Sequence, residues 1–256
     1  MSLNRVSLTV LAVAAGLFAG RALADDQAPH WSYEGHGGPA EWGQLSPNFE
    51  ACGIGKDQSP VDIRSALPAR LPPIKISYRA QPLALLNNGH TIQVNQAPGN
   101  FITFEGERYD LIQYHFHTPS EHTINGKAAP LEVHLVHKGA ESGKLTVLGV
   151  TLVPGKANPL IGAVWAAAPA EAGPVKEVPG VRLDPAALLP AKRAYYRYEG
   201  SLTTPPCSEV VHWVVFKQSI TASQAQIDAF AKLFPNNARP PQPINRRFIL
   251  ESQPTK

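Results

Sequence analysis

Short segments in which apolar and polar residues alternate, or in which β-branched and aromatic residues cluster, recur along most of the chain. This period of two is typical of strands whose two faces differ in polarity. The segments that show it are 74–78, 83–87, 91–95, 101–104, 108–117, 131–137, 145–153, 194–198 and 210–216. Their density predicts a large, mostly antiparallel sheet.

Helical patterns are few. Thr221 and Gln224 fit a capping box at the start of one short helix, which Pro235 ends. Asn158-Pro159 begins a second helix that runs through Trp165, with proline at its first position. We therefore expect a mainly β fold that a few short helices flank.

The chain shows no internal repeat and no interdomain linker. Its proline-rich patches at 68–73, 169–179 and 235–243 are short, which predicts loops within one domain. Hydrophobic residues make up 43% of the chain and charged residues 17%, a balance that allows a substantial core. The sequence predicts a single domain over residues 25–256.

The first 24 residues have the features of a secretory signal peptide. Arg5 precedes an apolar run from Val6 to about Ala19, and Ala22-Leu23-Ala24 provides a cleavage site. The run is shorter than the roughly 20 residues of a spanning helix, so we expect export without a membrane span in the mature chain. Removing two arginines changes the formal charge from +3 to 3 − 2 = +1, which argues against a nucleic-acid partner.

Export changes the interpretation of the only two cysteines, Cys52 and Cys207. In a reducing compartment both would be ordinary small buried residues, whereas an oxidising compartment favours a disulfide between them. We expect the disulfide, which would tie the N-terminal segment to the loop that contains Thr203.

Three histidines lie on two adjacent predicted strands. Because successive strand side chains point to opposite faces, His115 and His117 share a face with Gln113, and His134 shares a face with Glu132. The alternative is a polar face that merely meets solvent. Three neutral imidazoles with one open position form the ligand set of a catalytic zinc site, so the pattern predicts zinc binding.

Several motifs, taken together, resemble the α-class carbonic anhydrases from Trp31 to about Ile249. They are His30-Trp31-Ser32-Tyr33, Gln58-Ser59-Pro60-Val61-Asp62-Ile63, Asn87-Asn88-Gly89-His90, the Gln113–His117 run with Ser120-Glu121-His122, Glu132-Val133-His134-Leu135-Val136-His137, and Ser201-Leu202-Thr203-Thr204-Pro205-Pro206. The resemblance implies a twisted, mostly antiparallel central sheet of about ten strands, with zinc at the bottom of a conical cleft. It also implies reversible hydration of CO₂ to bicarbonate and a proton by zinc-bound hydroxide.

The resemblance assigns roles to particular residues. It makes His115, His117 and His134 the ligands of one zinc ion per chain, with Gln113 supporting the ring of His115 and Glu132 that of His134. Glu121 would accept the proton of the Thr203 hydroxyl, whose oxygen then orients the nucleophile. His90 matches the proton shuttle of the family.

The remaining assignments concern the surroundings of the reaction. Water-ordering positions and an apolar wall for CO₂ are implied, along with the cis peptide bonds Ser59-Pro60 and Pro205-Pro206. The water-ordering positions are Tyr33, Asn88 and Gln93, and the substrate pocket comprises Val136, Val147, Leu202, Thr204, Val211 and Trp213. His122 and His137 match structural positions, and His30, His36 and His212 have no assigned chemistry.

The short connection between His137 and Leu145 resembles the bacterial, exported branch of the family. Together with the signal peptide, this leads us to expect a periplasmic location, with secretion as the alternative. Bacterial members often form dimers, so a homodimer is possible, although no sequence feature identifies an interface.

Three alternatives compete with this interpretation. His115, His117 and Glu121 also fit the first metal motif of cupin oxygenases, but Tyr109 stands where that motif has glycine, and a fourth ligand histidine is missing. Metallo-β-lactamase chemistry would need an aspartate where Pro119 stands. A non-catalytic zinc buffer or binding domain would show a histidine-rich tract or a lost ligand, and the chain has neither.

Overall fold

The structure is a computed structural model that describes residues 29–253. The predicted signal peptide, residues 1–24, lies outside these residues. Within 29–253, no helix combines the length and the apolar character that crossing a bilayer requires.

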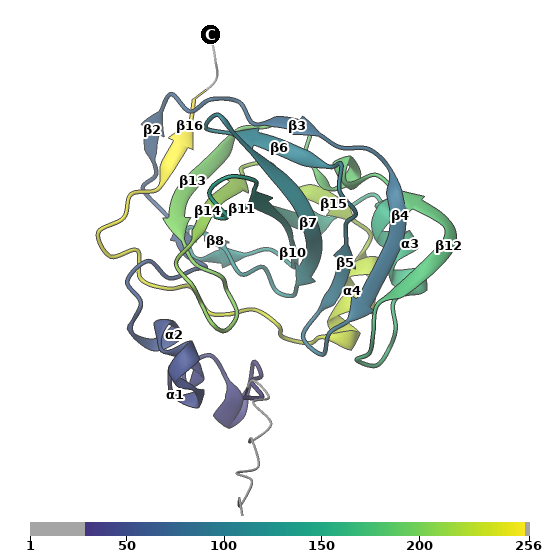
Figure 1. The fold of residues 1–256 in the computed structure, drawn as a ribbon, viewed down its shortest axis with the longest axis horizontal. Helices are drawn as coiled ribbons and strands as arrows, with labels where there is room; N and C mark the ends of the chain where they lie inside the picture. The colour runs from purple at the N-terminus through teal and green to yellow at the C-terminus, as the bar shows by residue number, and fades with distance from the viewer. Residues whose placement is uncertain (1–28, 254–256) are drawn as a thin grey trace, which may run out of the picture.

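A large twisted sheet forms the centre of the fold (Figure 1). Ten strands follow one another across it, in the order β12 (Lys176–Leu183), β4 (Gln81–Asn87), β5 (Ile92–Asn95), β7 (Glu107–His117), β10 (Leu131–Gly139), β11 (Leu145–Pro154), β14 (Val211–Phe216), β13 (Tyr195–Gly200), β16 (Leu250–Ser252) and β2 (Leu67–Ala69). Three further strands pair with this series: β3 (Lys75–Ser77), β6 (Phe101–Phe104) and β15 (Ile220–Ala222). Only β11–β14, β11–β15 and β16–β2 are parallel pairs in this sheet, so the predicted mostly antiparallel architecture is confirmed.

Every predicted strand segment corresponds to an observed strand, but seven strands of the described residues were missed, and all of these except β12 have only two or three residues. Two of the loop predictions are wrong at one end: β2 includes residues 68 and 69 of the predicted loop 68–73, and β12 begins at Lys176 within the predicted loop 169–179. Pro179 and Gly180 interrupt the alternation of β12, and its register shifts between Val178 and Arg182. β1 (Asp62–Ile63), β8 (Thr123–Ile124) and β9 (Lys127–Ala128) form a separate small sheet.

Four α-helices and three 3₁₀ helices flank the sheets in the described residues. The α-helices are α1 (Trp42–Leu45), α2 (Ala51–Ile54), α3 (Pro159–Ala167) and α4 (Gln224–Leu233), and the 3₁₀ helices are η1 (Gly35–Gly37), η2 (Pro47–Phe49) and η3 (Pro185–Leu188). Asn158 caps α3 as predicted, with Pro159 at the first helical position. The capping box of α4 lies two residues later than predicted, since Ser223 and Gln226 form it while Thr221 belongs to β15.

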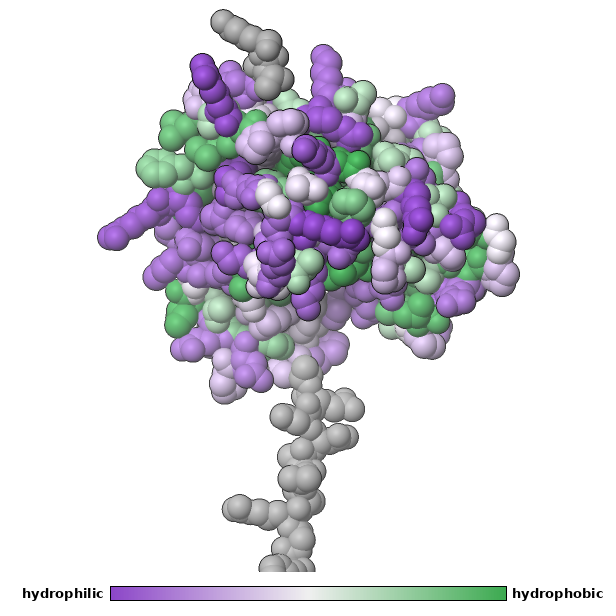
Figure 2. All heavy atoms as spheres, turned by 45° about the horizontal axis from the view of Figure 1, so that its top comes forward, coloured by the Kyte–Doolittle hydropathy of each residue, from purple (hydrophilic) through white to green (hydrophobic). Residues whose placement is uncertain are grey.

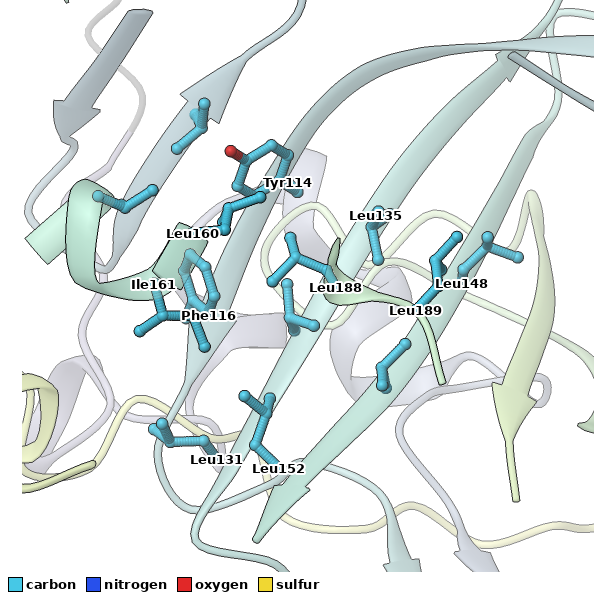
Figure 3. Packing of buried hydrophobic residues seen from close by; sticks show 14 of the residues in the cluster. Tyr114, Phe116, Leu131, Leu135, Leu148, Leu152, Leu160, Ile161, Leu188 and Leu189 are labelled. Atoms are coloured by element: carbon cyan, nitrogen blue, oxygen red, sulfur yellow. The ribbon is translucent and has the colours of Figure 1, made fainter. Parts of the chain in front are cut away.

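The two faces of β7 and β10 differ as the alternation predicted. Tyr114, Phe116 and Leu135 belong to a large apolar cluster that α3, α4 and η3 cover. Figure 3 shows Leu160 and Ile161 of α3 beside Phe116. The histidines point to the opposite face. The helix-covered core therefore packs against the side of β7 and β10 that faces away from the histidines.

A second cluster packs on the histidine side of the sheet, and a third joins the N-terminal helices to the rest. The third contains Trp42, Phe49 and the disulfide between Cys52 and Cys207, which confirms the predicted pairing. Ser59-Pro60 and Pro205-Pro206 have cis peptide bonds as the resemblance implied, and Thr118-Pro119 is also cis. On the face shown in Figure 2, polar side chains predominate and hydrophobic ones form only small groups.

Candidate active site

Antiparallel pairing of β7 with β10 brings the three histidines together. His134 lies directly opposite His115 in the register, and Glu132 lies opposite His117. One ring nitrogen from each of His115, His117 and His134 falls within 4.8 Å of the others. His117 and His134 are buried and His115 is partly exposed, so the cluster lies below a surface opening.

The contacts of each ring indicate which nitrogen faces the centre of the cluster. Nδ1 of His115 lies 2.8 Å from Gln113 Oε1, and Nδ1 of His117 lies 2.8 Å from the carbonyl oxygen of Asn237. Nε2 of His134 lies 3.0 Å from Glu132 Oε1. These contacts leave Nε2 of His115, Nε2 of His117 and Nδ1 of His134 for a common ligand.

Burial and neighbouring charges set the protonation of the rings. Burial, together with charge on the other two histidines, holds the pKa of His115 well below its usual range, and burial also lowers the pKa of His117. Burial alone would lower the pKa of His134, but the Glu132 carboxylate reverses the direction and raises it. His115 and His117 are therefore neutral at pH 7, as metal ligands must be.

Glu121 places a buried carboxylate beside the cluster. Its Oε2 lies 3.5 Å from His117 Nε2 and 3.7 Å from His134 Nδ1, while its Oε1 accepts a hydrogen bond from the Arg239 amide at 2.9 Å. In the described part of the chain, neither Glu121 Oε2 nor His117 Nε2 has a hydrogen-bond partner. His134 Nε2 also lacks one by hydrogen-bond geometry, although it lies 3.0 Å from Glu132 Oε1. Two unpartnered buried atoms at the meeting point of imidazole nitrogens fit a bound cation, and the nitrogen-rich donor set fits zinc.

The expected hydrogen bond between Thr203 and Glu121 is not formed in the described residues. Glu121 Oε1 accepts from the Arg239 amide, and Oε2 has no hydrogen-bond partner. Thr203 is nevertheless buried, with 6% of its surface exposed, in the loop that follows β13. Cys207, at the end of the same loop, forms the disulfide with Cys52 in α2. The loop is thus anchored near the cluster by a covalent bond.

A cavity of about 110 Å³ opens above the histidines, and we call it the inner cavity. Trp31 and Thr91 line it together with eight residues that the sequence analysis singled out. These eight are His115, His117, Gln113, His90, Thr204 and the water-ordering positions Tyr33, Asn88 and Gln93. Among the latter, Asn88 Nδ2 donates to Gln93 Oε1 at 3.5 Å. The structure therefore brings these predicted residues to one cavity, whereas His134, Glu121 and Thr203 do not line it.

His90 lies in the wall of the inner cavity, in a turn that begins at Asn88. Asn88 Oδ1 accepts hydrogen bonds from the amides of His90 and Thr91. Gly89, between Asn88 and His90, has φ +86°, a conformation that suits glycine. The imidazole of His90 stacks on the indole of Trp31 with 3.7 Å between ring centroids. Burial, and then the charge of His30, lowers the pKa of His90.

The predicted apolar wall forms one cluster on the histidine side of the sheet. Neighbouring strands place Val136 opposite Val147, and Val147 opposite Trp213. Val211 belongs to the same cluster, and Leu202 packs against it. The Trp213 ring lies 4.8 Å from the ring of His134, so apolar surface directly adjoins the cluster.

Residues far along the chain complete the surroundings, and the sequence motifs did not indicate two of them. Asn237 supplies the carbonyl contact of His117, and its side chain donates to the carbonyl oxygens of His90 and Phe116. Arg239, also fully buried, binds Glu121 through its amide. Both follow α4 in an irregular segment that has no periodic pattern, so spacing could not reveal them.

A family model described as eukaryotic-type carbonic anhydrase matches residues 37–253. The chain belongs to this family, the α-class carbonic anhydrases. Members of the family are zinc enzymes, and their reaction is the reversible hydration of CO₂, a lyase reaction. Among relatives, the carbonic anhydrase of Pectobacterium carotovorum is 47% identical over 224 residues, which cover 86% of this chain and 90% of that protein.

Other carbonic anhydrases support the same assignment. One from Nostoc sp. is 42% identical over 228 residues, which cover 87% of this chain and 86% of that protein. The solved α-carbonic anhydrase of Thermovibrio ammonificans, in complex with the inhibitor sulfanilamide, matches with a TM-score of 0.84 and 46% identity, covering 88% of this chain and all of that one. The cupin and metallo-β-lactamase alternatives are thereby wrong.

Proposed function

We propose that His115, His117 and His134 bind one zinc ion and that the chain uses it to interconvert CO₂ and bicarbonate. The observation that carries the proposal is the convergence of three imidazole nitrogens, two of them on neutral rings, beside the unpartnered Glu121 carboxylate. Bound zinc would lower the pKa of a coordinated water to about 7, a property for which carbonic anhydrase is the standard example.

Gln113, Glu132 and Asn237 fix the orientation of the three rings. Each offers an oxygen to the ring nitrogen that faces away from the centre, which holds the tautomer that a ligand needs. Glu132 is itself held by His122, whose Nδ1 lies 2.7 Å from Glu132 Oε1 and whose amide donates to Oε2. His122 and His134 together keep the pKa of Glu132 well below its usual range, against the effect of burial. The carboxylate is therefore ionised and can only accept.

Glu121 and Thr203 orient the attacking oxygen. With the site occupied, the Glu121 carboxylate would accept a hydrogen bond from the Thr203 hydroxyl through Oε2, which has no hydrogen-bond partner in the described residues. The hydroxyl oxygen of Thr203 then has only acceptor capacity toward the nucleophile, which points a lone pair at the substrate. The amide of Arg239 holds the other oxygen of Glu121 in place.

CO₂ has no net dipole, so apolar surface is the expected binding site for it. Val136, Val147 and Trp213 provide such a surface next to His134. Thr204, which lines the inner cavity, would contact bicarbonate as it leaves.

His90 accepts the proton that each hydration releases. Imidazole is the side chain whose usual pKa suits a relay at neutral pH, and burial, then the charge of His30, lowers the pKa of His90 from that value. The ring lies in the wall of the inner cavity with Asn88 and Gln93. Waters ordered by these amides and by Tyr33 would connect His90 to the reacting centre. We also propose that the mature chain is exported to the periplasm, where oxidising conditions maintain the Cys52–Cys207 disulfide.

Stopped-flow CO₂ hydration on protein of known metal content tests the function. The zinc-loaded protein should hydrate CO₂ far above the buffer rate, and the chelator-treated protein should not. Full zinc occupancy without hydration above background would contradict the proposal and favour a binding domain that has lost activity.

A further inference from the structure

A second cavity, of about 310 Å³, adjoins the inner cavity at His90, and we call it the outer cavity. The two cavities share Trp31, Tyr33 and His90, but no metal-ligand histidine lines the outer one. His90 is therefore in contact with both spaces. A proton that reaches His90 from the inner cavity can leave it through the outer one.

His30 is a second imidazole in the wall of the outer cavity. It is exposed and directly precedes Trp31, on which the His90 ring stacks. After burial, a positive charge on His30 is the second cause that lowers the pKa of His90, so charge on one ring disfavours charge on the other. His36, another exposed histidine of the N-terminal segment, lines neither cavity.

The outer cavity is large enough to hold a connected group of waters. A volume of about 310 Å³ corresponds to roughly ten water molecules at the density of the liquid. Glu34 also lines this cavity and favours positive charge there. Burial, and then the charge of Glu121, raises the pKa of Tyr33 well above its usual range, so the phenol stays neutral and does not take up the transferred charge.

We propose that His30 is a second proton-relay residue, which takes the proton from His90 through water in the outer cavity and delivers it to a buffer base in solution. In this step an N–H bond of the His90 imidazolium breaks, an N–H bond forms on His30, and no electrons are transferred. The neutral His90 can then accept the next proton. The proposal rests on the proposed function, because the hydration reaction supplies the proton.

Replacing His30 should slow turnover only when proton export limits it. We expect His30→Ala to lower kcat for CO₂ hydration about threefold in weak buffer, to leave kcat/KM unchanged, and to recover in imidazole buffer. His36→Ala is the matched control and should leave both constants unchanged. Because the relays act in series, adding His30→Ala to His90→Ala should cause no further loss. An unchanged kcat in His30→Ala, or an equal loss in His36→Ala, would overturn the proposal.

A histidine titration by NMR tests the link without turnover. In His30→Ala the apparent pKa of His90 should rise, because the repulsion from a charged His30 is gone, whereas His36→Ala should not shift it. An unchanged apparent pKa of His90 in His30→Ala would overturn the proposed relay. Absence of hydration in the zinc-loaded wild type contradicts the proposed function instead, and the titration separates the two failures.

Discussion

At the scale of single residues, the orientation of each histidine ring in the cluster depends on the oxygen atom that contacts its outward-facing nitrogen. Gln113 and Glu132 lie on the same strands as the rings they support, at a spacing of two that predicted a shared face, and the family resemblance implied their roles. Asn237 lies 120 residues beyond His117, and such a contact leaves no local pattern. The sequence thus indicated the three clustered histidines and their neighbours on the same strands, but not the partners that tertiary packing supplies.

Glu132 should determine how tightly zinc is held. We expect Glu132→Gln to weaken zinc affinity about 10- to 100-fold, since the ring of His134 loses its charged acceptor. Competition with a chromogenic chelator measures the change. The matched control is Glu199→Gln, because Glu199 contacts His212 at 2.6 Å outside the site and should not affect zinc. Equal affinities for Glu132→Gln and the wild type would contradict the assignment.

Thr203 should matter for the chemical step through its hydroxyl alone. We expect Thr203→Ala to lower kcat/KM for hydration about 100-fold, as other losses of one orienting hydrogen bond do. Thr203→Ser keeps the hydroxyl and should stay within about threefold of the wild type. If Ser and Ala lose activity equally, the side chain acts by packing and the proposed role of Glu121 fails with it.

At the scale of elements, the strands that carry the site were predictable and the margins of the sheet were not. β7, β10, β11 and β14 are buried and strongly patterned, so periodicity identified them. β12 was missed because an exposed edge strand needs no alternation. The sequence pattern predicted the N-cap of α4 at Thr221, but Thr221 pairs with β11 as part of β15, and Ser223 is the N-cap instead.

The Cys52–Cys207 disulfide connects α2 to the loop of Thr203 across 155 residues. Closing a loop of that length should stabilise the fold by about 5 kcal/mol if the effect is chain entropy. We expect the Cys52→Ser/Cys207→Ser double variant to lose about this much unfolding free energy in urea, and reductant to affect only the wild type. A loss of unfolding free energy below about 1 kcal/mol would contradict the chain-entropy model, in which the disulfide stabilises the fold by restricting the unfolded chain.

At the scale of the whole molecule, buried histidines make stability depend on pH. Burial lowers the pKa of His137 to about 4, from 6.5, while its Nδ1 lies 3.1 Å from the Thr146 carbonyl oxygen. Because the folded pKa lies below the unfolded one, the stabilisation is complete above about pH 6.5 and is lost as the pH falls toward 4. His115 and His117, whose pKa values are also lowered, act in the same direction.

Zinc-free protein should therefore lose stability between pH 7 and pH 4, with about 3 kcal/mol due to His137. Urea unfolding gives the unfolding free energy of the wild type and of His137→Asn at the two pH values. The contribution of His137 is the difference between the two proteins in the slope of unfolding free energy against pH. His36→Asn is the exposed control and should keep the slope of the wild type. Identical slopes for His137→Asn and the wild type would contradict the buried neutral state of His137.

Zinc-dependent hydration is the central claim, and a titration tests it most directly. Apo protein is titrated with zinc while the rate of CO₂ hydration is followed by stopped flow. We predict that the rate rises linearly to one zinc per chain and then stays constant, and that His134→Ala shows no rise. A rate that stays at background at one zinc per chain, or an equal rise in His134→Ala, would contradict the account.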